Sequence, residues 1–123
     1  MQNLPQENKL DNRNEIKQYY KPDFSILFKK IKGIKTPLKN NILISLLDGG
    51  WHPETELIRI AKKQNAPYVG AVTLGTMVHS LNHLLKSNYL EKRFINGEMY
   101  YKISDNYVGL TRAAYTKYSF KLD

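Results

Sequence analysis

Six side chains on one face of an expected helix are able to form hydrogen bonds with a ligand. The helix is predicted over residues 73–87, where apolar residues recur every three or four positions. The outward side chains are Thr76, His79 and His83, with Thr73, Ser80 and Lys86 beside them. This face has no aspartate or glutamate, which a plain solvated face more often includes. Short polar and basic side chains suit the base edges of a DNA major groove, with Lys86 better placed for phosphate, so the pattern favours DNA contact.

The histidines of this face, His79 and His83, also have the four-residue spacing of two metal ligands on a helix. No glutamate follows His79 in the His-Glu-x-x-His manner, and the chain has no cysteine to complete a site. We therefore expect neither a metal nor another cofactor. The sequence also lacks a glycine-rich phosphate loop and a convincing Ser-His-Asp order, so we expect a protein that is not an enzyme.

A second group of cations surrounds a predicted hairpin turn. Asn96-Gly97 is a strong signal for a two-residue turn, and it joins expected strands over residues 89–95 and 98–103. Lys92 and Arg93 precede this turn and Lys102 follows it. These three cations and Asn96 of the turn are expected to contact DNA, on its backbone or, for Arg93, in the minor groove. A charged edge that prevents sheet aggregation is the alternative. Lys39, near the start of an earlier helix, is a further candidate for phosphate contact.

The composition bounds the class of protein. Among 123 residues, 19 Lys and Arg stand against 11 Asp and Glu, which gives a net charge of +8. One domain with this surplus favours an anionic partner such as nucleic acid, and a merely solubilising surface charge is the alternative. The chain has no cysteine, no apolar run long enough for a membrane span and no signal-peptide core at its start. We therefore expect a cytoplasmic protein that does not engage membranes.

The elements that must position these residues begin with a short helix after Pro22, which Gly33 ends. Its apolar stripe is Phe24, Leu27, Phe28 and Ile31. Because so short a helix is not stable alone, it must dock either on the core of this domain or on a second copy of the chain.

Two further helices are expected before the one that carries the histidines. Thr36-Pro37 predicts a helix start, with a capping side chain followed by proline in the first turn. Trp51 and His52 are expected to form an extended link, after which Pro53 opens the second helix.

The histidine-bearing helix has the clearest predicted borders. Thr73 is expected to cap it, with Val72 and Met77 as a hydrophobic staple, and Asn88 to end it in a left-handed conformation. Its expected inward stripe is Leu74, Met77, Val78, Leu81, Leu84 and Leu85. After the hairpin, Ser104 is expected to cap a last helix.

The order of helix, helix, helix, strand, Asn-Gly turn and strand resembles the winged helix-turn-helix family, the MarR- and PadR-like regulators in particular. The residues that carry the resemblance are Thr76-Met77-Val78-His79, Leu81, Leu84, Leu85, Asn88-Tyr89-Leu90-Glu91-Lys92-Arg93 and Tyr100-Tyr101-Lys102-Ile103-Ser104. The chain departs from the family pattern at His79, where arginine is frequent, and at Asn88, where glycine is frequent. The resemblance implies a mainly α fold with a small β-hairpin wing and a transcription regulator that binds double-stranded DNA as a homodimer.

The resulting division assigns residues 1–21 to a flexible polar arm and residues 22–34 to the short amphipathic helix. Residues 35–104 form the expected winged-helix domain, and residues 105–123 a terminal helix or tail available for dimerisation. Two alternatives to sequence-specific regulation stay open. One is a winged-helix module that binds other proteins in a larger assembly, and the other is a non-specific binder of chromosomal DNA.

Overall fold

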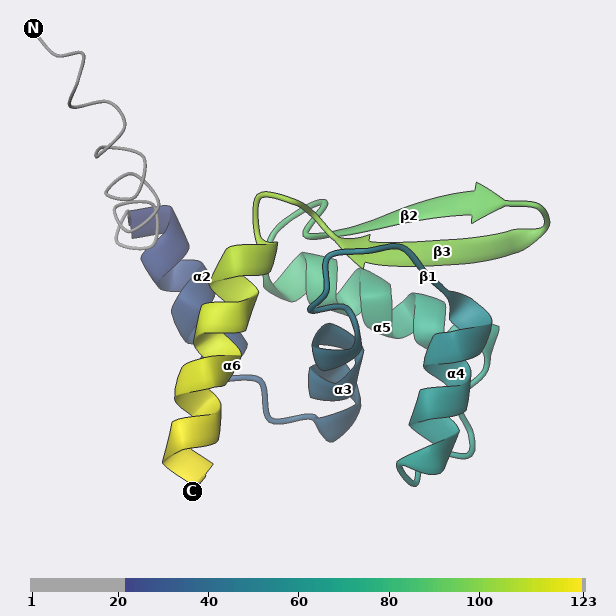
Figure 1. The fold of residues 1–123 in the computed structure, drawn as a ribbon, viewed down its shortest axis with the longest axis horizontal. Helices are drawn as coiled ribbons and strands as arrows, with labels where there is room; N and C mark the ends of the chain where they lie inside the picture. The colour runs from purple at the N-terminus through teal and green to yellow at the C-terminus, as the bar shows by residue number, and fades with distance from the viewer. Residues whose placement is uncertain (1–21, 123) are drawn as a thin grey trace, which may run out of the picture.

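The computed structural model describes the backbone of residues 22–122 and the side chains of residues 24–117. The helices of this part are α2 (Pro22–Lys32), α3 (Pro37–Ser45), α4 (Glu54–Lys63), α5 (Ala71–Leu84) and α6 (Val108–Leu122), and the strands are β1 (His52–Pro53), β2 (Leu90–Ile95) and β3 (Glu98–Ile103). The expectation of a mainly α chain with a small β-hairpin is confirmed (Figure 1). The expected arm of residues 1–21 lies outside the described residues.

The sheet has three antiparallel strands in the order β1-β3-β2. The segment predicted as an extended link is in fact β1, which pairs His52 with Tyr101 and Pro53 with Tyr100. A two-residue strand that contains proline has no alternation to recognise, so only its pairing with β3 identifies it. This pairing ties the hairpin to the corner between α3 and α4.

Asparagines set the turns at both ends of β2, as predicted. Asn96 and Gly97 have φ values of 50° and 82°, which is the left-handed pair that a two-residue hairpin turn needs. Asn88 has a φ of 62°, so its predicted left-handed conformation is confirmed. It lies in the turn before β2 and does not end α5, because the C-cap of that helix is Leu85 in a right-handed conformation.

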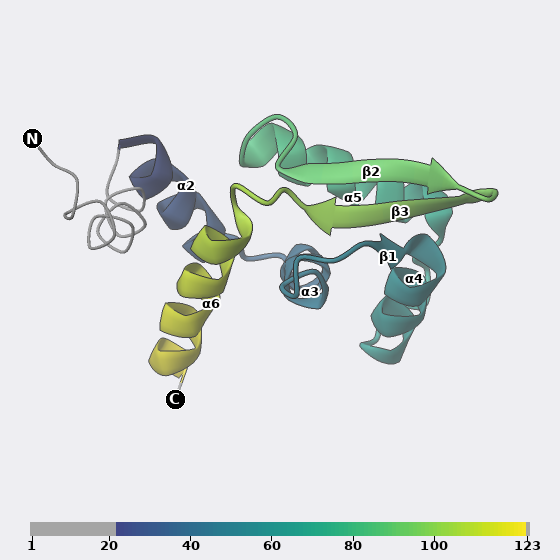
Figure 2. The ribbon, with the colours of Figure 1, turned by 45° about the horizontal axis from the view of Figure 1, so that its top comes forward.

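Register divides the hairpin into two faces, because paired residues share a face and neighbours along a strand alternate. The inner face holds Leu90, Lys92, Phe94, Met99, Tyr101 and Ile103. The outer face holds Glu91, Arg93, Ile95, Glu98, Tyr100 and Lys102. The inner face carries the buried strand residues and is turned toward α5, along which the hairpin extends (Figure 2).

Helix α5 begins earlier than predicted. Gly70 occupies its N-cap position without a side-chain bond, so Thr73 lies inside the first turn and is not the cap. Val72 is 84% exposed and does not form the expected staple with Met77. The buried side chains of Ala66 and Val69 anchor the preceding loop, which brings the chain into the helix at Ala71. The helix ends at Leu84, three residues short of the predicted end at residue 87.

The inward stripe of α5 is narrower than predicted. Leu74, Val78, Leu81 and Leu85 are buried, at a spacing of four, three and four residues. Leu84 is 40% exposed, because a residue next to this row points about 100° away from it on a helix of 3.6 residues per turn.

Two other predicted caps are absent. Thr36 stands at the N-cap of α3, but its side chain makes no capping hydrogen bond. Helix α6 begins at Val108, not at Ser104. The carbonyl of Ser104 instead accepts a bond from the Tyr107 N–H in the preceding turn, at 2.8 Å.

The apolar stripe of α2 docks on α6 of the same chain, which settles the choice left open by the sequence (Figure 1). Leu27 and Ile31 of α2 and Leu110 and Ala114 of α6 are buried in one core that continues through α3, α4, α5 and the sheet. The described side chains of residues 24–34 and 105–117 therefore contribute to the same core as the central part. Within the described residues, no helix is both long and apolar enough to cross a membrane.

Candidate nucleic-acid interface

Helix α5 presents a continuous exposed row, here named the α5 ridge. It consists of Val72, Thr76, His79 and His83, with Lys86 just beyond the helix end. The three side chains predicted to point outward do so, and Thr73 and Ser80 lie half-buried at the sides of the row. The ridge follows from periodicity: it is the face opposite Leu74, Val78 and Leu81, which hold α5 against the core.

The polar groups of the ridge differ in what they can still bind. The Thr76 hydroxyl donates a hydrogen bond to the Val72 carbonyl at 3.0 Å, so outward it offers a methyl group and acceptor lone pairs. His79 and His83 have no hydrogen-bond partner among the residues whose side chains are described. Both imidazoles are exposed and can each offer a donor and an acceptor to a ligand.

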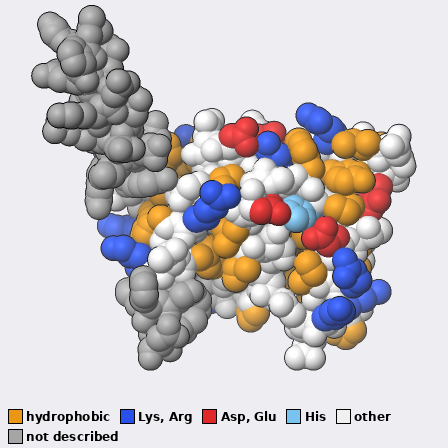
Figure 3. Space-filling view, in the orientation of Figure 1, with side chains coloured by type: hydrophobic (Ala, Val, Ile, Leu, Met, Phe, Trp, Pro, Cys, Tyr) orange, Lys and Arg blue, Asp and Glu red, His pale blue; other side chains and the backbone are white. Residues whose placement is uncertain are grey.

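Acidic side chains gather away from the ridge. Helix α5 contains none, whereas Asp48, Glu54, Glu56 and Glu98 lie around β1 and the start of α4. Figure 3 shows acidic groups around a histidine on the face toward the viewer, and Figure 1 shows α5 behind α3 and the sheet in the same orientation. The electrostatic potential at the ridge is therefore more favourable for an anionic ligand than the potential at the β1 corner.

A groove of about 610 Å³ lies between α5 and the inner face of the hairpin. Its lining is Gly75, Val78, His79, Asn82, Asn88, Leu90, Glu91, Lys92, Met99, Tyr101 and Ser104. Since His79 belongs to both the ridge and this lining, the two features form one continuous surface. Glu91, which the register places on the outer face of the hairpin, is the single acidic residue of the lining.

Two hydroxyl-bearing residues of the groove are buried without a partner. Tyr101 is 4% exposed and Ser104 is 8% exposed, and neither hydroxyl has a hydrogen-bond partner within the described part of the chain. Burial, together with the nearby Glu54 carboxylate, raises the pKa of Tyr101. Buried polar groups are almost always satisfied, so these hydroxyls are available to water or a ligand in the groove.

The cations expected on the hairpin are divided between its two faces. Lys92 is on the inner face and lines the groove opposite His79. Arg93 is on the outer face, where its guanidinium carbon lies 4.6 Å from the centre of the Trp51 ring. Lys102 lies over the same ring at 5.3 Å and donates to Asp105 at 3.0 Å. Arg93 and Lys102, predicted together with Lys92, therefore do not join α5 in one surface.

The remaining predicted residues lie at the margins. Asn96 is exposed at the hairpin tip, and Lys39 lies on α3, which contributes no residue to the groove. The sequence analysis missed Phe94, which is 66% exposed on the inner face. The sequence could have predicted that Phe94 shares a face with Lys92, because residues two apart on a strand point to the same side of the sheet.

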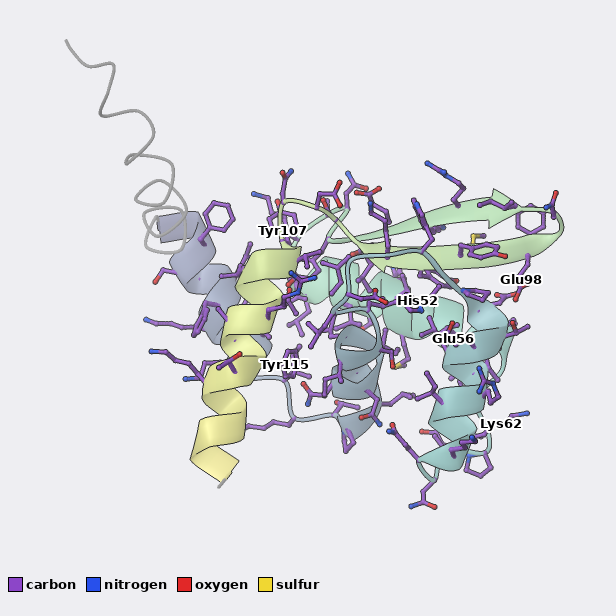
Figure 4. The ribbon with its side chains drawn as sticks, viewed as in Figure 1. His52, Glu56, Lys62, Glu98, Tyr107 and Tyr115 are labelled. Atoms are coloured by element: carbon purple, nitrogen blue, oxygen red, sulfur yellow. The ribbon has the colours of Figure 1, made fainter. Side chains whose placement is uncertain are left out.

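A second polar cluster, which the sequence analysis did not identify, lies at the β1 corner. His52 Nε2 is 2.8 Å from Asp48 Oδ1, and His52 Nδ1 is 2.9 Å from Glu56 Oε2 (Figure 4). Burial disfavours the imidazolium, but the bonds to Asp48 and Glu56 together outweigh it and raise the pKa of His52. The hydrogen bond from the Gly50 N–H is the largest cause that lowers the pKa of Asp48, and the hydrogen bond with His52 is the second. No group of three potential ligands in the described residues is arranged to hold a metal ion.

The outer face of the hairpin is also fixed to α4, through Glu98 of β3. The backbone N–H and the hydroxyl of Thr55 both donate to Glu98 Oε2, at 3.2 and 2.6 Å. Together with β1, this contact sets the angle of the hairpin relative to α4, and so the shape of the surface that it forms with α5.

Comparison with known proteins identifies no relative. No protein-family model, no curated protein and no solved structure matches the chain.

Proposed function

We propose that the chain is a winged helix-turn-helix protein that binds double-stranded DNA. In this proposal α5 enters the major groove and the β2–β3 hairpin is the wing that follows the DNA backbone. The observation that carries the proposal is the exposed, acid-free α5 ridge beside the inner face of the hairpin. The order α3, α4, α5, β2 and β3 also supports it, because the resemblance to winged-helix regulators depends on this order.

The charge distribution supports an anionic partner on this side of the molecule. The chain has a net charge of +8. Among the described side chains, Asp48, Glu54, Glu56 and Glu98 lie around β1 and the start of α4, and helix α5 carries no acidic residue. Lys86 beyond the end of α5 and Lys92 on the hairpin flank the ridge and are the cations proposed to contact phosphates. Arg93 and Lys102 are assigned a different role, which is to hold Trp51 against the outer face of the hairpin.

The groove is proposed to receive the sugar-phosphate backbone of one DNA strand. The hydroxyls of Tyr101 and Ser104 are donors with no partner among the described side chains, and phosphate oxygens are acceptors. Phosphate contacts fix the register of a protein on the duplex, whereas contacts to base edges read the sequence. We assign reading of the bases to Thr76, His79 and His83 on the ridge.

A transcription regulator that acts as a cytoplasmic homodimer on a pseudo-palindromic site is the specific form of this proposal. A dimer would place two copies of α5 in successive major grooves. Because α2 and α6 bury their stripes on each other, a dimer contact through these helices would use their remaining outer surfaces, where Ile26 of α2 is 53% exposed.

A second candidate function is a protein-interaction module. Two exposed apolar side chains favour it: Tyr68 in the loop before α5 is 69% exposed, and Val72 is 84% exposed. A partner protein docked on this patch would require no positive charge, and its binding would respond weakly to salt.

The test is a salt titration of duplex binding, followed by selection of bound sequences from random duplexes. Fluorescence anisotropy is expected to show the logarithm of the affinity falling linearly with the logarithm of the salt concentration. Selection is expected to enrich a short motif. Equal affinity for random and selected duplexes would favour the non-specific binder, and no binding at low salt would overturn the proposal.

A further inference from the structure

Val72 is the most exposed large apolar side chain in the described part of the chain, at 84%. It lies in the first turn of α5, four residues before Thr76 and seven before His79, and so belongs to the α5 ridge. Every other ridge position is polar. The isopropyl group is therefore the one apolar contact that this row can offer to a ligand.

The surroundings of Val72 allow a close approach to a large ligand. Gly70 and Ala71 precede it at the helix start, and a Cβ placed on Gly70 would have no atom within 4 Å. Ala71 is exposed as well. The Val72 carbonyl is occupied by the Thr76 hydroxyl, so this turn presents methyl groups rather than free acceptors.

The major groove contains one apolar group that matches such a side chain. Adenine, guanine and cytosine show only donors and acceptors there, while thymine adds its 5-methyl group. The ridge begins with the isopropyl group of Val72 and continues with the polar side chains of Thr76 and His79. It is therefore complementary to base pairs whose major-groove edges present a thymine methyl group followed by hydrogen-bond donors and acceptors.

We propose that Val72 is a specificity-determining residue that contacts the 5-methyl group of a thymine in the bound duplex. This inference rests on the proposed function, since it requires α5 in the major groove. It assigns the exposed Val72 to base reading, in place of docking on a protein.

The experiment removes the methyl group from the DNA and from the protein separately. In a duplex obtained by selection, each thymidine is replaced in turn by deoxyuridine, which keeps the base pair and lacks only the methyl group. The full chain and its Val72→Ala variant are compared on each duplex by fluorescence anisotropy. The wild-type chain is expected to bind about fourfold more weakly at one or two positions, the effect of one buried methyl group. Val72→Ala is expected to bind both versions of those duplexes equally.

The control variant is Ile44→Ala, which removes an apolar side chain 49% exposed on α3, away from the groove. It is expected to keep the full deoxyuridine effect. A wild-type chain that binds DNA with no deoxyuridine effect would overturn the inference and leave the proposed function standing. A deoxyuridine effect that persists in Val72→Ala would also overturn the inference and leave the proposed function standing. A chain that binds no duplex would overturn both this inference and the proposed function. A change in self-association that Val72→Ala causes and Ile44→Ala does not would overturn the inference and assign Val72 to contact with a second copy of the chain.

Discussion

Lys92 and Arg93 are neighbours in β2 but serve opposite faces of the sheet. Lys92 lines the groove beside α5, whereas Arg93 lies over the Trp51 ring on the outer face. The pair provides a matched comparison, because the two substitutions remove the same charge from adjacent positions. The proposed function therefore predicts that only one of them affects DNA binding directly.

Lys92→Ala is expected to weaken binding to all duplexes alike and to reduce the salt slope by about 1, because one phosphate contact is lost. Arg93→Ala is expected to leave the salt slope unchanged and to lower the free energy of unfolding by about 0.5–1 kcal/mol, through loss of the cation–π contact. Anisotropy at several salt concentrations and urea denaturation measure the two effects. Equal losses of affinity for the two variants would contradict this assignment.

His79→Ala is expected to relax sequence preference. His79 is exposed, has no partner among the described side chains and is placed to bind a base edge. Loss of one hydrogen bond predicts an affinity about fivefold lower for the selected duplex, at about 1 kcal/mol. Affinity for random duplexes should change little. The control is Lys86→Ala, which is expected to weaken selected and random duplexes by the same factor.

Tyr101→Phe is expected to separate stability from binding. The hydroxyl is buried without a described partner, so its removal should leave the melting temperature unchanged or raise it slightly, because no hydrogen bond is broken and a desolvated group is lost. If the groove receives a phosphate, affinity for all duplexes should fall by about 1 kcal/mol. Calorimetry and anisotropy measure the two quantities. A variant that is destabilised but keeps full affinity for DNA would show that the Tyr101 hydroxyl does not contact the duplex.

The His52 cluster predicts a pH dependence of stability. The pKa of His52 is raised above its usual value of 6.5, so its charged form is stabilised by folding. This contribution is fully present below about pH 6.5 and is lost as the pH rises through the folded-state pKa. The lowered pKa of Asp48 acts in the opposite direction: its contribution is present above its usual value of 3.8 and is lost in acid. Stability should therefore be highest between these two limits.

The test compares urea unfolding of the wild-type chain and of His52→Gln at pH 5.5 and pH 8.5. The variant is expected to be less stable at the lower pH by about 1 kcal/mol, a modest value because Asp48 is 63% exposed. The difference between variant and wild type should shrink at the higher pH. His83→Gln is the matched control, because it makes the same change at an exposed imidazole that has no partner among the described side chains. A constant difference at both pH values would show that His52 acts only through packing.

Several features of the fold follow from short stretches of the chain. The left-handed conformations of Asn88 and of Asn96-Gly97 were predicted correctly, because the left-handed backbone is a preference of those residues themselves. The outward position of Thr76, His79 and His83 follows from the apolar period that faces them. The general class of the fold, helices with one hairpin, follows from the change of period after Asn88.

Contacts between distant segments decided the rest. The sequence by itself determined that Thr76, His79 and His83 of α5 point outward, since helical geometry repeats every 3.6 residues whatever the surroundings. Only the tertiary structure decided that β1 pairs with β3, that Arg93 stacks on Trp51, and that α2 is covered by α6. It also brought Tyr101 and Ser104 into the lining of one groove. These relationships join residues far apart in the chain, and local conformational preference carries no information about which distant group will be packed against a side chain.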